Sequence, residues 1–103
     1  MQNSLLPFIE RDIAGRTIKI LIDTGCSKNY IKPLKGLKNI TAVDNPFMVK
    51  SIHGFTCINK KCTINLFDTN STFFILPSLS TFDAIVGLDL LTQISAVLDF
   101  KSK

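Results

Sequence analysis

The chain has 103 residues, 46% of them hydrophobic and 19% charged, which favours one small folded domain over residues 1–103 and excludes a disordered chain. Its net charge of +4 comes from lysines scattered along the sequence, a pattern that favours a solvated basic surface over a nucleic-acid site. Eight Phe and no Trp, among many Ile, Leu and Val, favour a β-rich core.

The N-terminal part of the sequence predicts a β-hairpin that leads into an acidic loop. Two apolar runs, residues 6–13 and 17–22, are separated by Ala14 and Gly15, which are typical of a tight turn. The second run alternates at first and then becomes fully apolar, as a strand buried on both faces does. It ends at Asp23, so the sequence places a carboxylate just beyond a buried strand.

The remaining sequence predicts mostly short strands and one helix. Residues 32–45, rich in Gly, Pro, Asn and Asp, are expected to be irregular, and residues 68–71 to form a turn. Apolar residues with helical spacing predict a short helix over residues 88–94. Runs of alternating or continuous apolar residues predict strands at residues 29–31, 47–49, 55–58, 62–67, 72–76, 83–87 and 96–100. The pair 47–49 and 55–58 reads as a hairpin with its tip near residues 52–54.

Two separated motifs support each other. Asp23-Thr24-Gly25 follows a hydrophobic strand, and Val86-Gly87-Leu88-Asp89-Leu90-Leu91 comes later in the chain. With both motifs the sequence resembles the retropepsins, which are the retroviral-type aspartic proteases, and it is most similar to the proteases of gypsy-like LTR retrotransposons. The resemblance covers residues 8–100. It implies an all-β, closed, barrel-like fold with one short C-terminal helix and one lobe per chain.

The resemblance also implies a homodimeric endopeptidase. Aspartic protease chemistry needs two carboxylates, one ionised and one protonated, and this chain carries a single Asp-Thr-Gly triplet. A second copy of the chain is therefore expected to complete the active site. Asp23 is the expected catalytic residue, with Thr24, Gly25 and Cys26 in the active-site loop, and no metal or other cofactor is required.

The expected substrate is a retroelement polyprotein cut at hydrophobic sites. The hairpin with Ser51, Ile52, His53 and Gly54 at its tip corresponds to the flap that closes over the substrate in this family. Asp83 and Ile85 are expected to line side-chain pockets, with Asp83 favouring a basic side chain. The C-terminal strand over residues 96–100 is expected to hold the dimer together.

Several alternatives remain open from the sequence. Asp23 could simply cap a turn before a glycine, and the domain could be a catalytically silent dimerisation or peptide-binding module. His53, Cys57 and Cys62 could be read as metal ligands, although their spacing misses the common zinc patterns. Cys26 could serve as a nucleophile with His53, although nothing in the sequence pairs them. The basic charge alone could indicate a nucleic-acid-binding β-barrel.

The sequence gives no sign of a signal peptide or of an apolar run of membrane-spanning length, so no membrane partner is expected. Three cysteines are an odd number, which argues against a closed disulfide framework and fits a reducing compartment. The expected location is the cytoplasm, within retroelement virus-like particles.

Overall fold

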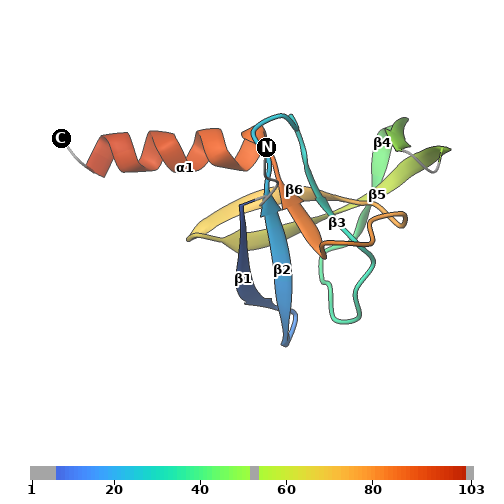
Figure 1. The fold of residues 1–103 in the computed structure, drawn as a ribbon, viewed down its shortest axis with the longest axis horizontal. Coiled ribbons are helices and arrows are strands. Elements are labelled where there is room, and N and C mark those ends of the chain that lie inside the picture. The colour runs from blue at the N-terminus through green and yellow to red at the C-terminus, as the bar shows by residue number, and fades with distance from the viewer. Residues whose placement is uncertain (1–6, 52–53, 102–103) are drawn as a thin grey trace, which may run out of the picture.

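The structure, a computed structural model, describes the backbone of residues 7–51 and 54–101 and the side chains of residues 7–50 and 54–95. The described strands form one curved sheet in the order β1-β2-β7-β3-β6-β5-β4 (Figure 1). These strands are β1 (Phe8–Ile13), β2 (Arg16–Ile22), β3 (Asn29–Ile31), β4 (Thr41–Ser51), β5 (Gly54–Leu66), β6 (Thr69–Ile75) and β7 (Ala84–Val86). They are followed by a helix, α1 (Leu88–Lys101). Within the described part of the chain, no helix is long and apolar enough to cross a membrane.

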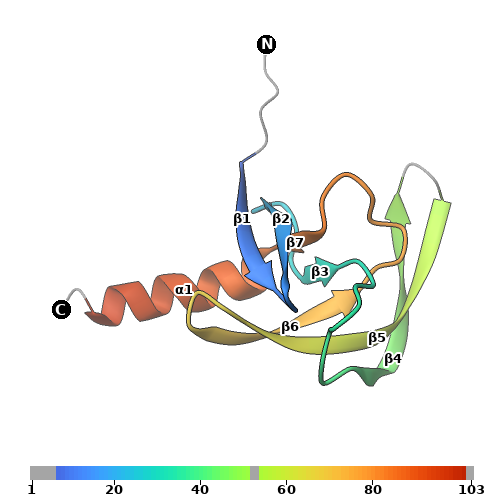
Figure 2. The same cartoon turned by 90° about the horizontal axis from the view of Figure 1, so that it is seen from below.

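The fold is mostly β as expected, but its sheet is not closed into a barrel. Its edge strands are β1 and β4, which lie at opposite ends of the strand order. The β4–β5 hairpin extends away from the rest of the sheet, and α1 projects on the opposite side of the molecule in both ribbon views (Figures 1 and 2). The edge strands β1 and β4 are not paired with each other, so the sheet is open and the expectation of a closed barrel is wrong for this chain.

The strands near the candidate site agree with the sequence pattern. The hairpin of β1 and β2 turns at Ala14 and Gly15, which both have positive φ. This is the geometry of a two-residue turn that matches the twist of antiparallel strands. The short strands β3 and β7 lie in the centre of the sheet, and their residues are apolar except for Asn29, which begins β3.

Four expectations about segment boundaries are wrong. Residues 41–45, expected to be irregular, belong to β4, and the two expected strands at 55–58 and 62–67 merge into β5. Polar residues 69–71, expected in a turn, belong to β6. Residues 96–100 are helical, because α1 continues to Lys101. A helix forms its backbone hydrogen bonds within its own segment, whereas a strand needs a neighbouring strand, so this apolar segment is satisfied as a helix without a partner.

Two apolar clusters support the described fold. The larger lies where the sheet packs against the start of α1, and its fully buried members include Ile18, Ile20, Ile31, Phe73, Val86 and Leu90. The smaller lies at the base of the β4–β5 hairpin around Tyr30, Ile58 and Leu76. The loop that follows β2 contacts the smaller cluster through Cys26.

Candidate active site

Asp23 is held at the end of a central strand. Ile22, the last residue of β2, pairs in parallel with Val86 of β7. The backbone N–H of Asp23 then donates a hydrogen bond of 3.0 Å to the carbonyl oxygen of Val86. The carboxylate is half-buried, and Thr24 and Gly25 after it are exposed. The chain thus leaves the sheet at Asp23 and presents a carboxylate at its surface.

The loop is organised around the Asp23 carboxylate. The backbone N–H of Gly25 donates to Asp23 Oδ1 at 2.9 Å, and the N–H of Cys26 donates to the Asp23 carbonyl oxygen at 3.2 Å. A Cβ at Gly25 would lie 3.2 Å from the same Oδ1, so a larger residue there would crowd the carboxylate. Among the described residues, no contact joins Asp23 to a second carboxylate of the same chain. None of the hydrogen bonds found among the described residues uses Asp23 Oδ2, which leaves that oxygen able to accept one from a ligand.

Gly87 allows the loop to pack directly on the start of α1. A Cβ at Gly87 would come closer than 3.0 Å to the carbonyl oxygens of Lys28 and Cys26, so only glycine fits. The first N–H groups of α1 also donate to carbonyl oxygens of this loop. Leu88 N–H donates to Cys26 O at 2.7 Å, and Asp89 N–H donates to Ser27 O at 3.1 Å. The loop therefore caps the helix, and the helix fixes the loop.

Asn29 is a structural residue of the site that the sequence analysis missed. Its side chain is fully buried, and its oxygen accepts a hydrogen bond of 3.0 Å from the Gly87 N–H. Its amide nitrogen donates to Ser71 Oγ, the Thr72 carbonyl oxygen and Asp89 Oδ2, at 3.1, 3.0 and 3.3 Å. One side chain thus joins β3, β6 and the start of α1 behind the loop. The sequence signal was weak: a polar residue that opens a short apolar strand.

Cys26 faces inward beside Asp23. Its thiol donates a hydrogen bond of 3.2 Å to the carbonyl oxygen of Lys28, and the side chain packs with the smaller apolar cluster. Burial raises the pKa of the Cys26 thiol above its ordinary value, and the nearby Asp23 carboxylate raises that pKa further. The thiol is therefore neutral at neutral pH, which is the wrong state for a nucleophile.

An apolar surface lies between this loop and the β4–β5 hairpin. Ile85, expected to line a pocket, is half-buried in the smaller cluster, where it is joined by hairpin residues. The rings of Phe47 and Phe74 pack edge to face with their centroids 5.1 Å apart. The partly buried members of this cluster are Cys26, Val43, Phe47, Val49, Phe74, Leu79 and Ile85. The loop and the hairpin thus share one hydrophobic surface.

The described strands of the hairpin end on either side of the expected tip. Ser51 ends β4 and pairs with Gly54, which begins β5 with a φ of 112°. This positive φ favours glycine. Ile52 and His53, which were also expected to contact substrate, lie outside the described residues.

Asp83 has other partners than a substrate. Its Oδ2 accepts a hydrogen bond of 2.8 Å from the Lys19 N–H, and its Oδ1 lies 3.0 Å from Lys32 Nζ. The hydrogen bond from Lys19, followed by the interactions with Lys32, lowers the pKa of the Asp83 carboxyl, although partial burial opposes this. Its backbone N–H also donates to Lys19 O at 2.9 Å, so Asp83 connects the residue before β7 to β2 by hydrogen bonds.

The cysteines of β5 do not converge. Cys57 is exposed and Cys62 is fully buried, and residues five apart on a strand point to opposite faces. The described residues contain no group of three or more His, Cys, Asp or Glu side chains that could hold a metal ion.

Comparison of the sequence with known proteins gives a relative. No protein-family profile matches the chain. The sequence is 58% identical over 96 residues, 93% of this chain, to a part of the Retrovirus-related Pol polyprotein from transposon gypsy of Drosophila melanogaster. The chain is similar to a region of a retrotransposon Pol polyprotein. It spans 9% of that polyprotein's length, so the similarity concerns one segment of a much longer protein.

Proposed function

We propose that this chain is an aspartic endopeptidase that acts as a homodimer. The observation that carries the proposal is the Asp23 carboxylate. It accepts a hydrogen bond from the Gly25 N–H at the start of a loop that packs on Gly87. The relative is a Pol polyprotein, which fits a protease that cuts such a polyprotein. The substrate in this proposal is a retroelement polyprotein, and the site of action is the cytoplasm, within virus-like particles.

The chemistry needs Asp23 from two copies. Two carboxylates at one site cannot both ionise easily, so they share one proton. The ionised Asp23 takes a proton from a bound water while the water oxygen attacks the carbonyl carbon of the peptide. The protonated Asp23 of the second copy gives its proton to the carbonyl oxygen, which forms a neutral tetrahedral diol. Transfer of a proton to the amide nitrogen and collapse of the diol then release the amine and the carboxylic acid.

The surface around Asp23 suits such a pairing. Thr24 and Gly25 follow the carboxylate and are exposed. Leu88, whose N–H donates to the Cys26 carbonyl of the loop, is a large apolar side chain that is 45% exposed. We assign dimer contact to this surface. The proposal does not use residues 96–100 as a strand between copies, because that segment is helical in the single chain.

The smaller apolar cluster supplies the expected hydrophobic preference. A peptide lying between the Asp23 loop and the β4–β5 hairpin would contact Ile85 and the partly buried aromatic rings. Hairpin closure would exclude water from the reacting groups, which strengthens the electrostatic interactions there.

The test is cleavage of a hydrophobic peptide library at mildly acidic pH over a series of protein concentrations. Asp23→Asn keeps an oxygen for the Gly25 N–H and removes the ionisable group, so it should fold and lose all turnover. Asp68→Asn, on the exposed turn between β5 and β6, is the matched control and should retain activity. We expect turnover to rise faster than linearly with concentration and to vanish with a statine-type transition-state analogue. A dimer, detected by sedimentation, that binds peptides and cuts none would instead make the chain a peptide-binding module.

A further inference from the structure

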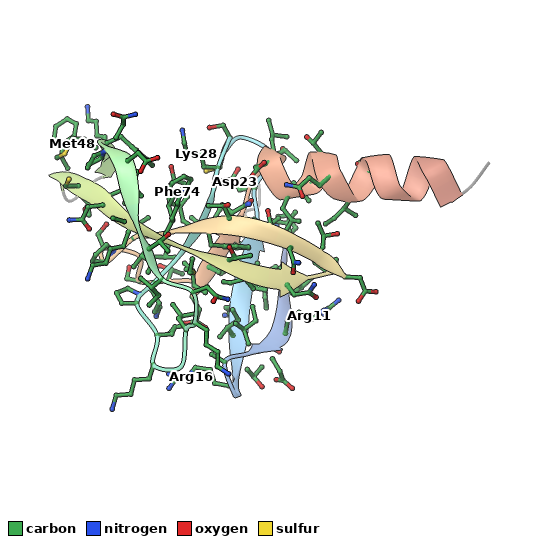
Figure 3. All side chains as sticks on the ribbon, turned by 180° about the vertical axis from the view of Figure 1, so that it is seen from behind. Arg11, Arg16, Asp23, Lys28, Met48 and Phe74 are labelled. Carbon is green, nitrogen blue, oxygen red and sulfur yellow. The ribbon has the colours of Figure 1, made fainter. Side chains whose placement is uncertain are left out.

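A groove of about 730 Å³ begins beside the Asp23 loop and carries two ammonium groups. Its lining includes Ser27, Lys28, Lys61, Phe74 and Asp89. It therefore lies between the loop, strands β5 and β6, and the first turn of α1. Figure 3 shows Lys28 and Asp23 on the same side of the molecule, with Lys28 nearer to the β4–β5 hairpin.

The Lys28 ammonium is held between the loop and the hairpin. Its Nζ lies 4.9 Å from the centroid of the Phe47 ring, which belongs to β4. This cation–π contact directs the long side chain toward the hairpin rather than into open solvent. A peptide that lies under the hairpin would therefore pass close to the Lys28 charge.

The positive charge of this groove is not neutralised by an ion pair. In the part of the chain that the structure describes, the salt bridge found is Lys32 with Asp83, and it involves neither Lys28 nor Lys61. Asp89 is the carboxylate of the same groove. Its two oxygens accept hydrogen bonds from Asn29 and Gln93 at 3.3 Å each, which orient it toward α1 and β3. The groove thus has a net charge of +1 from two lysines and one aspartate.

We propose that Lys28, assisted by Lys61, makes the site prefer a peptide with an acidic side chain near the cleaved bond. This inference rests on the proposed function, since it names the substrate class of the same site. A carboxylate of the peptide would form an ion pair with the Lys28 ammonium, which lies over the Phe47 ring in a groove also lined by Phe74. Because a two-fold dimer brings one Lys28 from each copy, the acidic preference should occur on both sides of the cleaved bond.

An acidic peptide fits the groove better than the phosphates of a nucleic acid. Lys28 contacts Phe47, which belongs to the apolar cluster with Phe74 and Ile85, and an apolar surface suits alternating side chains of an extended peptide. A nucleic-acid site would need a continuous basic track with stacking rings, and here the Phe47 ring is covered by Lys28.

The experiment compares peptides that differ only by Glu or Gln at one position, scanned along both sides of a cleaved bond. Cleavage is measured with the wild-type chain, and binding is measured by calorimetry with Asp23→Asn, which separates recognition from chemistry. We expect Glu peptides to be favoured about two- to fivefold at one or more positions on each side, the range for a partly exposed ion pair. The ratio should fall to about one in Lys28→Gln and invert in Lys28→Glu, by the same electrostatic argument. Lys38→Gln changes the same charge on the separate surface near Gly36 and should leave the ratio unchanged.

The outcomes separate the two proposals. Equal cleavage of Glu and Gln peptides by the wild-type chain overturns the acidic preference and leaves the protease proposal standing. A Lys28-dependent preference in binding by Asp23→Asn, without any cleavage by the wild type, overturns the protease and keeps the recognition. If single-stranded RNA binds in a Lys28-dependent manner and acidic peptides do not, the charge serves a nucleic acid and the inference is wrong.

Discussion

The side-chain oxygen of Asn29 accepts a hydrogen bond of 3.0 Å from the backbone N–H of Gly87, and both residues are buried. The same amide bonds Ser71 and Thr72 of β6. This contact fixes the strand that precedes α1 to the strand that follows the Asp23 loop. The position of Asp23 therefore depends on a residue that lies behind the loop.

Replacing Asn29 should destabilise the fold. Asn29→Ala leaves the buried Gly87 N–H and the Thr72 carbonyl without their partner, and buried unpaired groups cost about 1–3 kcal/mol each. We expect the free energy of unfolding to fall by about 2–3 kcal/mol in urea titrations. Asn65→Ala is the control, because it removes an exposed hydrogen bond to Asn70 and should cost less than about 1 kcal/mol. Equal losses in the two variants would show that the buried network adds nothing.

Gly87→Ala should disturb the loop more than the fold. The added Cβ would collide with the carbonyl oxygens of Lys28 and Cys26, which are backbone atoms and cannot rotate away. We expect a loss of about 1–3 kcal/mol in unfolding free energy and a larger relative loss of peptide cleavage. Gly15→Ala is the comparison, since its φ of 78° strains alanine while no atom lies within 4 Å of the new Cβ. It should lose stability without a specific loss of cleavage.

The elements around Asp23 could be predicted because local pattern and tertiary environment agree there. The apolar run of β2 suits a buried strand, and Ala14-Gly15 suits a tight hairpin turn. Gly87 suits the close contact with the loop carbonyls. The sequence could not show that Asn29 would bond Gly87, because that contact joins residues distant in sequence.

The errors arise where tertiary contacts override local signals. Ser71 is polar and sits beside Asn70, which indicated a turn, but in β6 its hydroxyl is buried against Asn29. The turn lies instead at Phe67 and Asp68, which both have positive φ. Residues 96–100 carry apolar residues suited to either state, and in the structure they continue α1 instead of joining the sheet.

Stability should depend on Asp83 in a defined pH range. Because the folded pKa of Asp83 is lowered from the ordinary value of 3.8, its ionised form stabilises the fold above that value, and this contribution is lost as the pH falls through the folded pKa. Asp83→Asn should therefore be less stable than the wild type at pH 7, with the difference disappearing at low pH. Urea unfolding from pH 7 down to acid measures it, with the exposed Asp44→Asn as control. A difference independent of pH would contradict the role of ionisation.

The three cysteines should react with iodoacetamide at clearly different rates. Cys57 is exposed on β5 and should be alkylated first. Burial raises the pKa of Cys26 and of Cys62, so both should react slowly because the thiolate is the reactive form. Cys62 is 2% exposed and should react last, at the rate at which the fold opens. Peptide mass spectrometry over a time course at pH 8 gives the order. Fast alkylation of Cys26 ahead of Cys57 would indicate an activated thiol beside Asp23 and would reopen the hypothesis of a cysteine nucleophile.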